Sequence, residues 1–425
     1  MAITLFCLIV VVLFAFGFPV AISFMMASLG YVVASGGNCV IILKQSVSGV
    51  NSFVYLAVPL FILAAQVMNA SSISQRLFDF CNKLVGHIPG GLGHVNVVSS
   101  IIFSGMSGSA LADTSGIGFL AYDSMQKRGF DKSFSAALTI ASASIGPIIP
   151  PSITMVIYAV IANASVGSLF LGGVLPGLLL GGTLMAYCVI ADRIYHFPRE
   201  KKATPSELAS SFLNALLPLL TPVILIGGIY SGAFTPTEAS AVAAFYAILL
   251  GLWYNRGREG LRALVKVARE TVRLTGMTMF IVATASVFSW VITKENIPQH
   301  LTAWVLEMNM SKEVFLVVVN LIILGLGCAI DINTILLVFV PIVIPIAIRL
   351  GVDLVHFGVI ITLGLMIGML TPPFGMQLFL ISGLTKIPIK KIVISLWPML
   401  VCTLITLAAI TAYSPLVLWL PSLLK

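Results

Sequence analysis

The chain has 425 residues, of which 59% are hydrophobic and only 9% are charged, whereas an average soluble domain has about 25% charged residues. This composition excludes an ordinary soluble protein and indicates a protein that crosses a membrane several times. The formal net charge of +8 does not indicate nucleic-acid binding, because the basic residues lie in loops between apolar segments. The six cysteines are scattered singly, so neither a disulfide framework nor a cysteine-based metal site is predicted.

Apolar segments that can span a membrane, which needs about 20 residues, follow one another along the chain. The first is interpreted as a retained span, since it has neither the basic start nor the cleavage site of a signal peptide. Ten spans are predicted, at residues 3–16, 20–36, 52–70, 133–163, 167–195, 213–232, 236–254, 275–292, 355–383 and 392–420. Two further apolar stretches, 92–126 and 313–349, are interrupted by small and polar residues and predict re-entrant hairpins that enter and leave on one side.

Two of the predicted spans contain a double proline. Residues 146–151 read Gly-Pro-Ile-Ile-Pro-Pro, and residues 368–373 read Gly-Met-Leu-Thr-Pro-Pro. Two successive prolines remove two amide donors and clash with the preceding helical turn. Such a backbone is tolerated at membrane depth only inside protein or beside a watery cavity. Both spans are therefore predicted to be broken helices.

An internal repeat relates the two broken spans, which align without gaps at an offset of 222 residues. The offset matches both double prolines, Gly146 with Gly368, Asp131 with Asp353, Gly129 with Gly351 and Pro176 with Pro398. Each unit, about 1–195 and 213–421, holds five spans and one hairpin. Because five is odd, the second unit must be inserted upside down, and inverted repeats with broken helices are typical of secondary transporters.

The distribution of basic residues predicts the orientation of the chain. The predicted loops place 18 of the 23 lysines and arginines on one side of the membrane and five on the side of the N-terminus. Positive residues favour the cytoplasm, so both termini are expected in the periplasm of a bacterial inner membrane. The first hairpin would then open to the cytoplasm and the second to the periplasm.

The hairpin tips and the proline breaks are candidate ion sites, because an interrupted helix leaves main-chain carbonyl oxygens free. One Na⁺ site per repeat is predicted. The first would use Ser104, Ser107, Gly146, Ile149 and Pro150, and the second Gly325, Cys328, Gly368, Thr371 and Met376. The alternative is that these small residues only permit close helix packing.

Asp113 and Asp331 are the carboxylates within the hairpins, and a carboxylate at membrane depth is a functional-site candidate. Either could bind a proton, help to hold a cation or contact a substrate. The alternative is that each caps the start of a helix. The chain has no G-x-x-x-x-G-K-[ST], HExxH or G-x-S-x-G motif, so no enzyme activity is expected.

Four runs of residues are distinctive enough to compare with known families. They are Val58-Pro59-Leu60-Phe61, residues 104–109 with Ala112-Asp113, residues 146–152, and Gly232-Ala233-Phe234-Thr235-Pro236-Thr237-Glu238-Ala239. Together they resemble the large membrane subunit of the TRAP transporters (tripartite ATP-independent periplasmic transporters). The resemblance extends over essentially the whole chain.

This resemblance implies Na⁺-driven uptake of an organic acid anion, such as sialic acid or a C4-dicarboxylate. It implies two partners, a periplasmic substrate-binding protein and a small four-span membrane subunit, expected as a separate chain because no extra N-terminal block is present. The anion would meet helix N-termini at the hairpins. Candidate contacts are Ser107, Ser109, Asp113, Ser152 and Asp331.

The resemblance also implies an elevator mechanism, in which one part of the chain moves against another. Residues 1–70 and 213–292 would form the scaffold, and 92–195 and 313–425 the moving transport domain. Amphipathic arms are expected at 71–91, 259–274 and 293–312, and a cytoplasmic loop with a capping box of Thr204 and Glu207 at 196–212. Two alternatives remain, a stand-alone Na⁺/dicarboxylate symporter without a binding protein and a membrane scaffold or channel that couples nothing.

Overall fold

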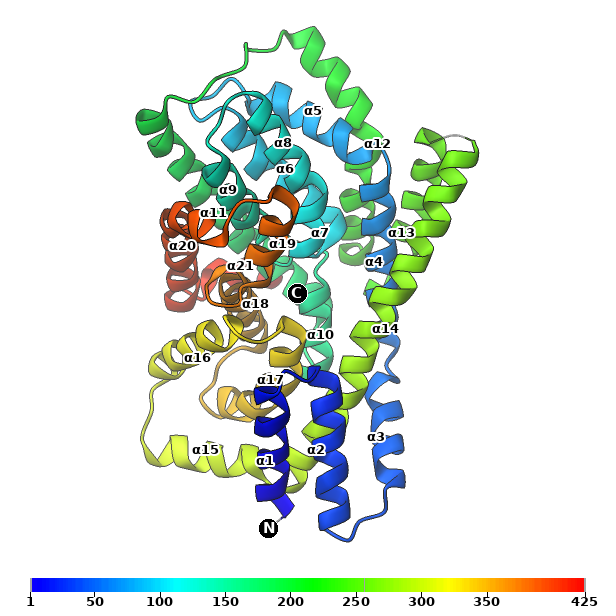
Figure 1. Cartoon of the computed structure of the whole chain (residues 1–425), viewed down its shortest axis with the longest axis vertical. Helices are drawn as coiled ribbons and strands as arrows, with labels where there is room; N and C mark the ends of the chain where they lie inside the picture. Colours follow the sequence, from blue (N-terminus) through cyan, green and yellow to red (C-terminus); the bar gives the residue numbers. More distant parts are fainter. Residues whose placement is uncertain (1, 256, 424–425) are drawn as a thin grey trace.

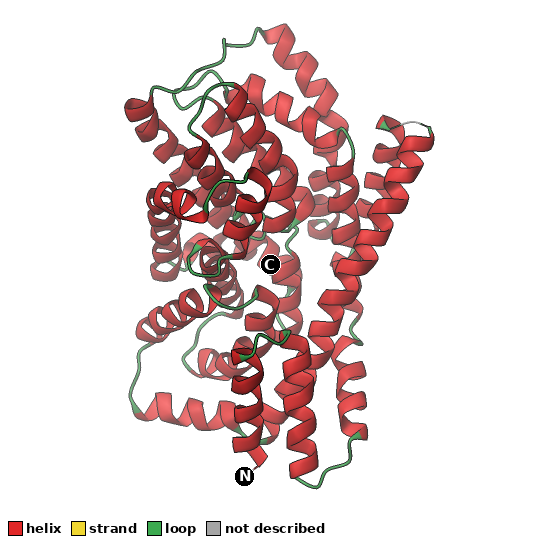
Figure 2. Ribbon diagram, viewed as in Figure 1, coloured by secondary structure: helices red, strands yellow, loops and turns green. Residues whose placement is uncertain are grey.

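The chain is described by a computed structural model at residues 2–255 and 257–423, and within these ranges it forms helices joined by loops, without a strand (Figure 1 and Figure 2). Seven helices among the described residues are long and apolar enough to cross a membrane. They include Phe53–Ala70, Val166–Tyr195, Pro205–Tyr230, Pro236–Tyr254 and Ile389–Ala412. The chain is therefore an all-helical, multi-pass membrane protein.

The first half of the chain contains the predicted first hairpin and first broken helix. Its elements are α1 (Ala2–Ala15), α2 (Val20–Ala34), α3 (Val40–Val50), η1 (Phe53–Leu56), α4 (Ala57–Ala70), α5 (Ile73–Val85), α6 (Leu92–Ser107), α7 (Ala110–Asp113), η2 (Thr114–Gly118), α8 (Phe119–Lys127), α9 (Lys132–Ala143), α10 (Ile153–Ala162) and α11 (Val166–Tyr195). Elements α6 to α8 form the hairpin, and the helix pair α9 and α10 is interrupted at 144–152.

The second half repeats this order with longer helices before its hairpin. Its elements are α12 (Pro205–Tyr230), α13 (Pro236–Tyr254), α14 (Arg258–Lys294), α15 (Ile297–Glu307), α16 (Lys312–Gly327), α17 (Ile332–Arg349), α18 (Leu354–Leu370), α19 (Met376–Thr385), α20 (Ile389–Ala412) and α21 (Pro415–Leu423). Here α16 and α17 form the hairpin, and α18 and α19 are the two parts of the broken helix.

Two of the predicted spans near the N-terminus form short helices. α1 and α2 have 14 and 15 residues and reach about 21–23 Å at about 1.5 Å per residue, less than the roughly 30 Å of a hydrocarbon core. They pack against each other in the lower part of Figure 1. The next helix, α3, was not predicted, because its Lys44, Gln45 and Ser46 interrupt the apolar run.

The segment 259–274 is not a separate amphipathic arm. It forms the first half of α14, a single helix of 37 residues, about 55 Å long, that continues through the predicted span 275–292. The side chains change from charged to apolar near Leu274, but no proline follows there that would end the helix. The other arms are separate helices, α5 within 71–91 and α15 within 293–312.

Two further boundaries differ from the prediction. The loop predicted at 196–212 ends early, because the capping box of Thr204 and Glu207 starts α12 at Pro205. The span predicted at 392–420 ends at Ala412, and the separate helix α21 follows after Tyr413 and Ser414 and packs against α11 and α18. Residues 424 and 425 of the predicted transport domain lie outside the described residues.

The two broken helices run in opposite directions in Figure 1: α10 lies below α9, whereas α19 lies above α18. The repeat-related residues before them have the same local structure. Gly129 and Gly351 have φ of 82° and 69°, and Asp131 and Asp353 cap α9 and α18 through their carboxylates. The second part of each broken helix packs against the other unit. α10 packs against α17 and α18 of the second unit, whereas α19 packs against α9 and η2 of the first unit.

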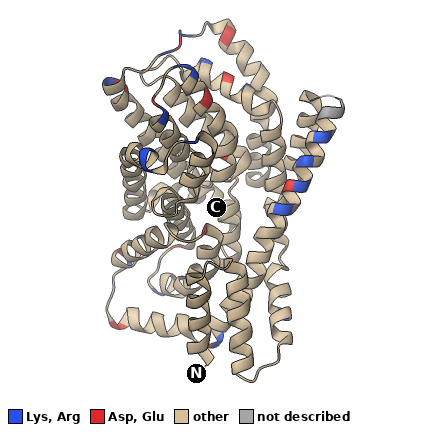
Figure 3. Ribbon diagram, viewed as in Figure 1, with Lys and Arg blue, Asp and Glu red and all other residues tan. Residues whose placement is uncertain are grey.

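Basic residues gather in the upper loops and along the upper half of α14, and few lie in the lower part of the molecule (Figure 3). The N-terminus lies at the lower end, and the C-terminus is marked near the middle of the view (Figure 1). The placement of both termini on one side of the membrane stays a prediction.

Candidate ion and substrate site

The tip of the first hairpin is shaped by a glycine. α6 ends at Gly108, whose φ of +60° is a left-handed conformation that favours glycine. A Cβ atom at this position would lie 2.4 Å from the carbonyl oxygen of Pro151, so only glycine lets the tip approach the break between α9 and α10. The amide of Ile153 donates to the Gly108 carbonyl at 3.4 Å, which joins the hairpin to the start of α10.

Asp113 is the centre of this junction. Its side chain is completely buried and accepts a hydrogen bond from the hydroxyl of Ser107. The Ser104 oxygen lies 3.5 Å from Oδ2 of Asp113, and its proton goes to the nearer Ser100 carbonyl at 2.5 Å. A Cβ atom added to Gly146 would lie 2.5 Å from Oδ2 of Asp113, so the carboxylate rests against the backbone of the broken helix. In the part of the chain that the structure describes, the ion pairs do not include Asp113.

Three of the residues predicted for the first Na⁺ site therefore surround one carboxylate. These are Ser104, Ser107 and Gly146, and the fold brings Asp113 together with them. Ile149 and Pro150 lie in the adjacent break, where the peptide bond between Pro150 and Pro151 is cis. The pairing of Asp113 with Gly146 could not be read from the chain, since it depends on how α7 packs against α9.

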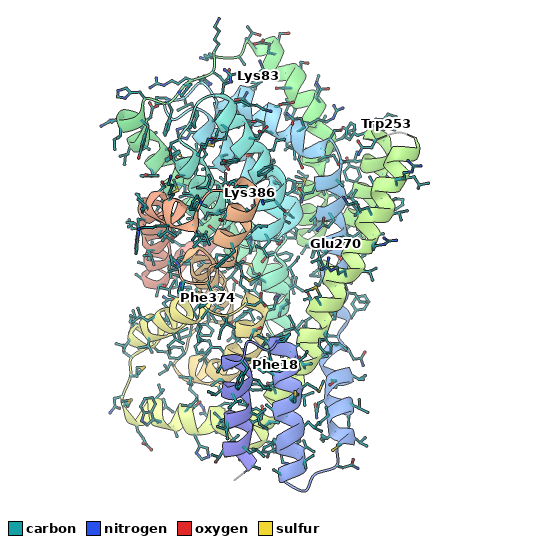
Figure 4. The ribbon with its side chains drawn as sticks, viewed as in Figure 1. Phe18, Lys83, Trp253, Glu270, Phe374 and Lys386 are labelled. Carbon is teal, nitrogen blue, oxygen red and sulfur yellow. The ribbon has the colours of Figure 1, made fainter. Side chains whose placement is uncertain are left out.

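The second hairpin meets the second break in a similar way. The amide of Phe374 donates to the carbonyl of Cys328 at 3.0 Å, and the Thr371 hydroxyl donates to the Ile367 carbonyl at 2.7 Å. Phe374 lies near the middle of the molecule with 61% of its side chain exposed (Figure 4). Gly368 faces Gly327 across this junction.

The sequence prediction named Gly325 for this junction and did not name Gly327. Gly325 lies on the exposed side of α16, with no atom within 4 Å of an added Cβ. Met376 begins α19 and is 40% exposed. The repeat offset pairs Gly327 with Gly105 of the first hairpin, and this pairing could have identified it. The second junction contains no counterpart of Asp113, because the offset places Ile335 there.

Three of the candidate substrate contacts are helix caps. Ser109 caps α7 by accepting from the amide of Ala112 at 3.4 Å, and Asp331 caps α17 by accepting from Asn333 and Thr334. Ser109 and Asp331 are related by the repeat offset. Ser152 is fully buried, caps α10 through the amide of Met155 and donates to the Pro147 carbonyl. Its hydroxyl group is therefore engaged within the break.

Comparisons with known proteins show the family of the chain. The family model of the tripartite ATP-independent periplasmic transporter, DctM component, matches residues 7–416. The sialic acid TRAP transporter large permease protein SiaM of Vibrio cholerae is 41% identical over 409 residues, which cover 96% of this chain and 95% of SiaM. The C4-dicarboxylate TRAP transporter large permease protein DctM of Pseudomonas aeruginosa is 40% identical over 370 residues, covering 87% of this chain and 86% of that protein.

A solved structure shares the fold at much lower sequence identity. The YdaH transporter of Alcanivorax borkumensis superimposes with a TM-score of 0.63 at 14% identity, covering 87% of each chain. The family model, by contrast, matches nearly the whole sequence, including both hairpins and both broken helices. The chain therefore belongs to the DctM family and is the permease component of a tripartite ATP-independent periplasmic transporter, not an enzyme.

Proposed function

We propose that this permease takes up an organic acid anion, delivered by a periplasmic binding protein, by coupling its movement to Na⁺ entry. The observation that supports this most directly is the fully buried Asp113, surrounded by the hydroxyls of Ser104 and Ser107 and the backbone of Gly146. Buried charges in proteins are paired or coordinate a metal ion. A Na⁺ ion at this junction would supply the missing positive charge.

The first site would use oxygen atoms that the fold already brings together. Asp113, Ser104 and Ser107 supply side-chain oxygens, and the break at Gly146, Ile149 and Pro150 supplies main-chain carbonyls. Carbonyl oxygens freed where a membrane helix unwinds are a recurrent Na⁺ ligand in transporters. The second site, at Gly325, Cys328, Gly368, Thr371 and Met376, would depend on carbonyls and the Thr371 hydroxyl.

The substrate class is supported by the relatives. The printed names of SiaM and DctM give sialic acid and C4-dicarboxylates, and that of the YiaN protein of Escherichia coli, 37% identical, gives 2,3-diketo-L-gulonate. All are carboxylate anions. The N-terminus of α17 binds a carboxylate in this structure, since its Asn333 and Thr334 amides donate to Asp331. We place the substrate between the two hairpin tips, beside Ser107, Ser109 and Asp331.

An elevator movement of the transport domain fits the contacts between the two parts of the chain. Glycines of the first hairpin touch the scaffold: a Cβ atom on Gly105 would lie 2.7 Å from Cβ of Pro222 in α12, and one on Gly116 would lie 2.0 Å from Oδ1 of Asn69 in α4. Small residues give a smooth surface for close approach. The opposite directions of the broken helices support inverted repeats with the ion sites near the midplane.

The proposed complex lies in the inner membrane, with the basic upper end of Figure 3 in the cytoplasm. Its partners are a small four-span membrane subunit and the binding protein. Reconstitution in liposomes tests this: uptake of a radiolabelled acid should require the small subunit, the loaded binding protein and an inward Na⁺ gradient. Uptake by this chain alone would favour a stand-alone symporter, and uptake that ignores the Na⁺ gradient would overturn the coupling.

A further inference from the structure

A network of buried side-chain hydrogen bonds joins α6 to α9 one helical turn before Ser104. Nδ2 of Asn96 donates to the hydroxyl of Thr139 at 2.9 Å, and the Ser142 hydroxyl donates to Oδ1 of Asn96 at 2.9 Å. The Ser100 hydroxyl donates to Ser142 at 3.1 Å. The Ser104 hydroxyl donates to the main-chain carbonyl of Ser100 at 2.5 Å. We call Asn96, Ser100, Thr139 and Ser142 the polar ladder.

Two contacts fix the orientation of the Asn96 amide. Its Nδ2 donates to the Thr139 hydroxyl and lies 3.7 Å from the sulfur of Met125, an acceptor, so Oδ1 faces the Ser142 hydroxyl and can only accept. The Ser142 hydroxyl has one proton for two acceptors, Oδ1 of Asn96 at 2.9 Å and the Thr139 carbonyl at 3.1 Å, so the Ser100 hydroxyl donates to Ser142. The Ser104 hydroxyl gives its proton to the Ser100 carbonyl, which leaves the lone pairs of its oxygen available at the Asp113 junction.

The second unit has no polar side chains at the positions of the ladder. The offset of 222 residues places Val318, Ile322, Ile361 and Gly364 at the positions of Asn96, Ser100, Thr139 and Ser142. The four ladder side chains are completely buried, whereas Val318 and Ile322 lie on the exposed side of α16. Where α16 packs against α18, the buried polar side chain is Asn320, whose Nδ2 donates to the Thr411 hydroxyl at 2.9 Å. The hydrogen bonds of the ladder are therefore specific to the first unit at these positions.

We infer that Asn96, Ser100, Thr139 and Ser142 are positioning residues that hold α6, and with it Ser104, against α9 and the break beside Asp113, and so set the Na⁺ affinity of the first site. This inference rests on the proposed function. Groups that orient the ligands of a metal change its affinity about 10–100-fold when they are removed. A ladder that only supported packing would change the stability of the protein and leave its Na⁺ affinity unchanged.

Two variants remove the ladder with little change of volume, Thr139→Val and Ser142→Ala. The melting temperature of the full-length permease is measured against Na⁺ concentration, with K⁺ replacing Na⁺ at constant ionic strength. We expect the Na⁺ concentration for half-maximal stabilisation to rise about tenfold in both variants, and Thr139→Ser, which keeps the hydroxyl, to retain the wild-type value. If Thr139→Ser folds and keeps the wild-type Na⁺ dependence, the effect of Thr139→Val comes from the lost hydroxyl and not from disturbed packing.

The matched control is Thr362→Val in α18, whose buried hydroxyl donates to the Gly358 carbonyl of its own helix at 2.8 Å. It should lower the melting temperature equally in Na⁺ and K⁺. If the wild type responds to Na⁺ and the ladder variants respond at the same concentration, the inference is wrong while the proposed function stands. If the wild type itself is equally stable in Na⁺ and K⁺, the proposed first site fails and the inference fails with it.

Discussion

Gly327 and Gly368 meet backbone to backbone where the second hairpin packs on the second broken helix. A Cβ atom added to Gly327 would lie 2.9 Å from Cα of Gly368, and one added to Gly368 would lie 2.6 Å from Cα of Gly327. Neither neighbour can move aside as a flexible side chain could. The repeat offset pairs these residues with Gly105 and Gly146, and in the first unit Gly146 faces Asp113 instead.

Gly368→Ala should therefore destabilise the transport domain. Forcing a methyl group into a close-packed contact typically costs about 1–3 kcal/mol, and we expect a clear fall in the melting temperature of the purified permease. Gly383→Ala is the control, because an added Cβ in this exposed turn of α19 meets no atom within 4 Å. Equal melting temperatures of the two variants would contradict the close contact.

Asp113→Asn tests the negative charge at the first junction. Asparagine has nearly the same shape and can still accept from Ser107, but it cannot balance a cation. We expect the Na⁺ concentration for half-maximal uptake to rise at least tenfold, which corresponds to about 1.4 kcal/mol of lost ion binding. The same change at the exposed cap Asp353, where asparagine caps equally well, should leave the Na⁺ dependence unaltered. A normal Na⁺ dependence of Asp113→Asn would show that the carboxylate does not hold the ion.

Local signals in the chain predict the breaks and hairpins well. A double proline acts on its own backbone, and a run such as Ser104-Gly105-Met106-Ser107-Gly108-Ser109 contains the glycine that ends α6 and the serine that caps α7. The continuity of α14 was not predictable in this way, because the change from a charged to an apolar surface resembles a boundary between two helices. Composition describes what surrounds a helix, whereas helix ends depend on caps and prolines.

The candidate site was predictable only in part. The residue types and the two junctions could be named, since hydroxyls and breaks are visible in the sequence. The contacts between these residues could not be predicted, because Asp113 meets Gly146 through the packing of α7 on α9. The role of a single residue was also open, since Asp331 fits equally well as a helix cap or as a ligand. The polar ladder was overlooked for a related reason: Asn96 lies 43 and 46 residues before Thr139 and Ser142, and the three form one network only when α6 and α9 pack.

The opposite orientation of the two units predicts a labelling pattern for Lys127 and Arg349. These exposed residues end α8 and α17 and are related by the repeat offset. In a background without Cys7 and Cys39, which are exposed, a membrane-impermeant maleimide should label Arg349→Cys in right-side-out vesicles. Lys127→Cys should react only after the membrane is opened. Labelling of both from one side would exclude inverted repeats.

Thr371→Val tests whether a second Na⁺ site exists beside the first. Valine keeps the volume of threonine and removes the hydroxyl, which caps the end of α18 through the Ile367 carbonyl. If two ions bind, uptake should depend steeply on Na⁺ concentration in the wild type. Loss of one site should raise the Na⁺ requirement and flatten this dependence toward that of a single ion.

Thr371→Ser keeps the hydroxyl and should behave as the wild type does. Ser107→Ala at the other junction makes the test specific. Each of the two variants, Thr371→Val and Ser107→Ala, should leave one Na⁺ site intact. The protein that carries both changes should lose Na⁺ coupling altogether. A Thr371→Val protein with the wild-type steepness and Na⁺ requirement would mean that the second junction holds no ion. Gly327 and Gly368 would then serve packing alone, and the repeat would have kept its ion site only in the unit that contains Asp113.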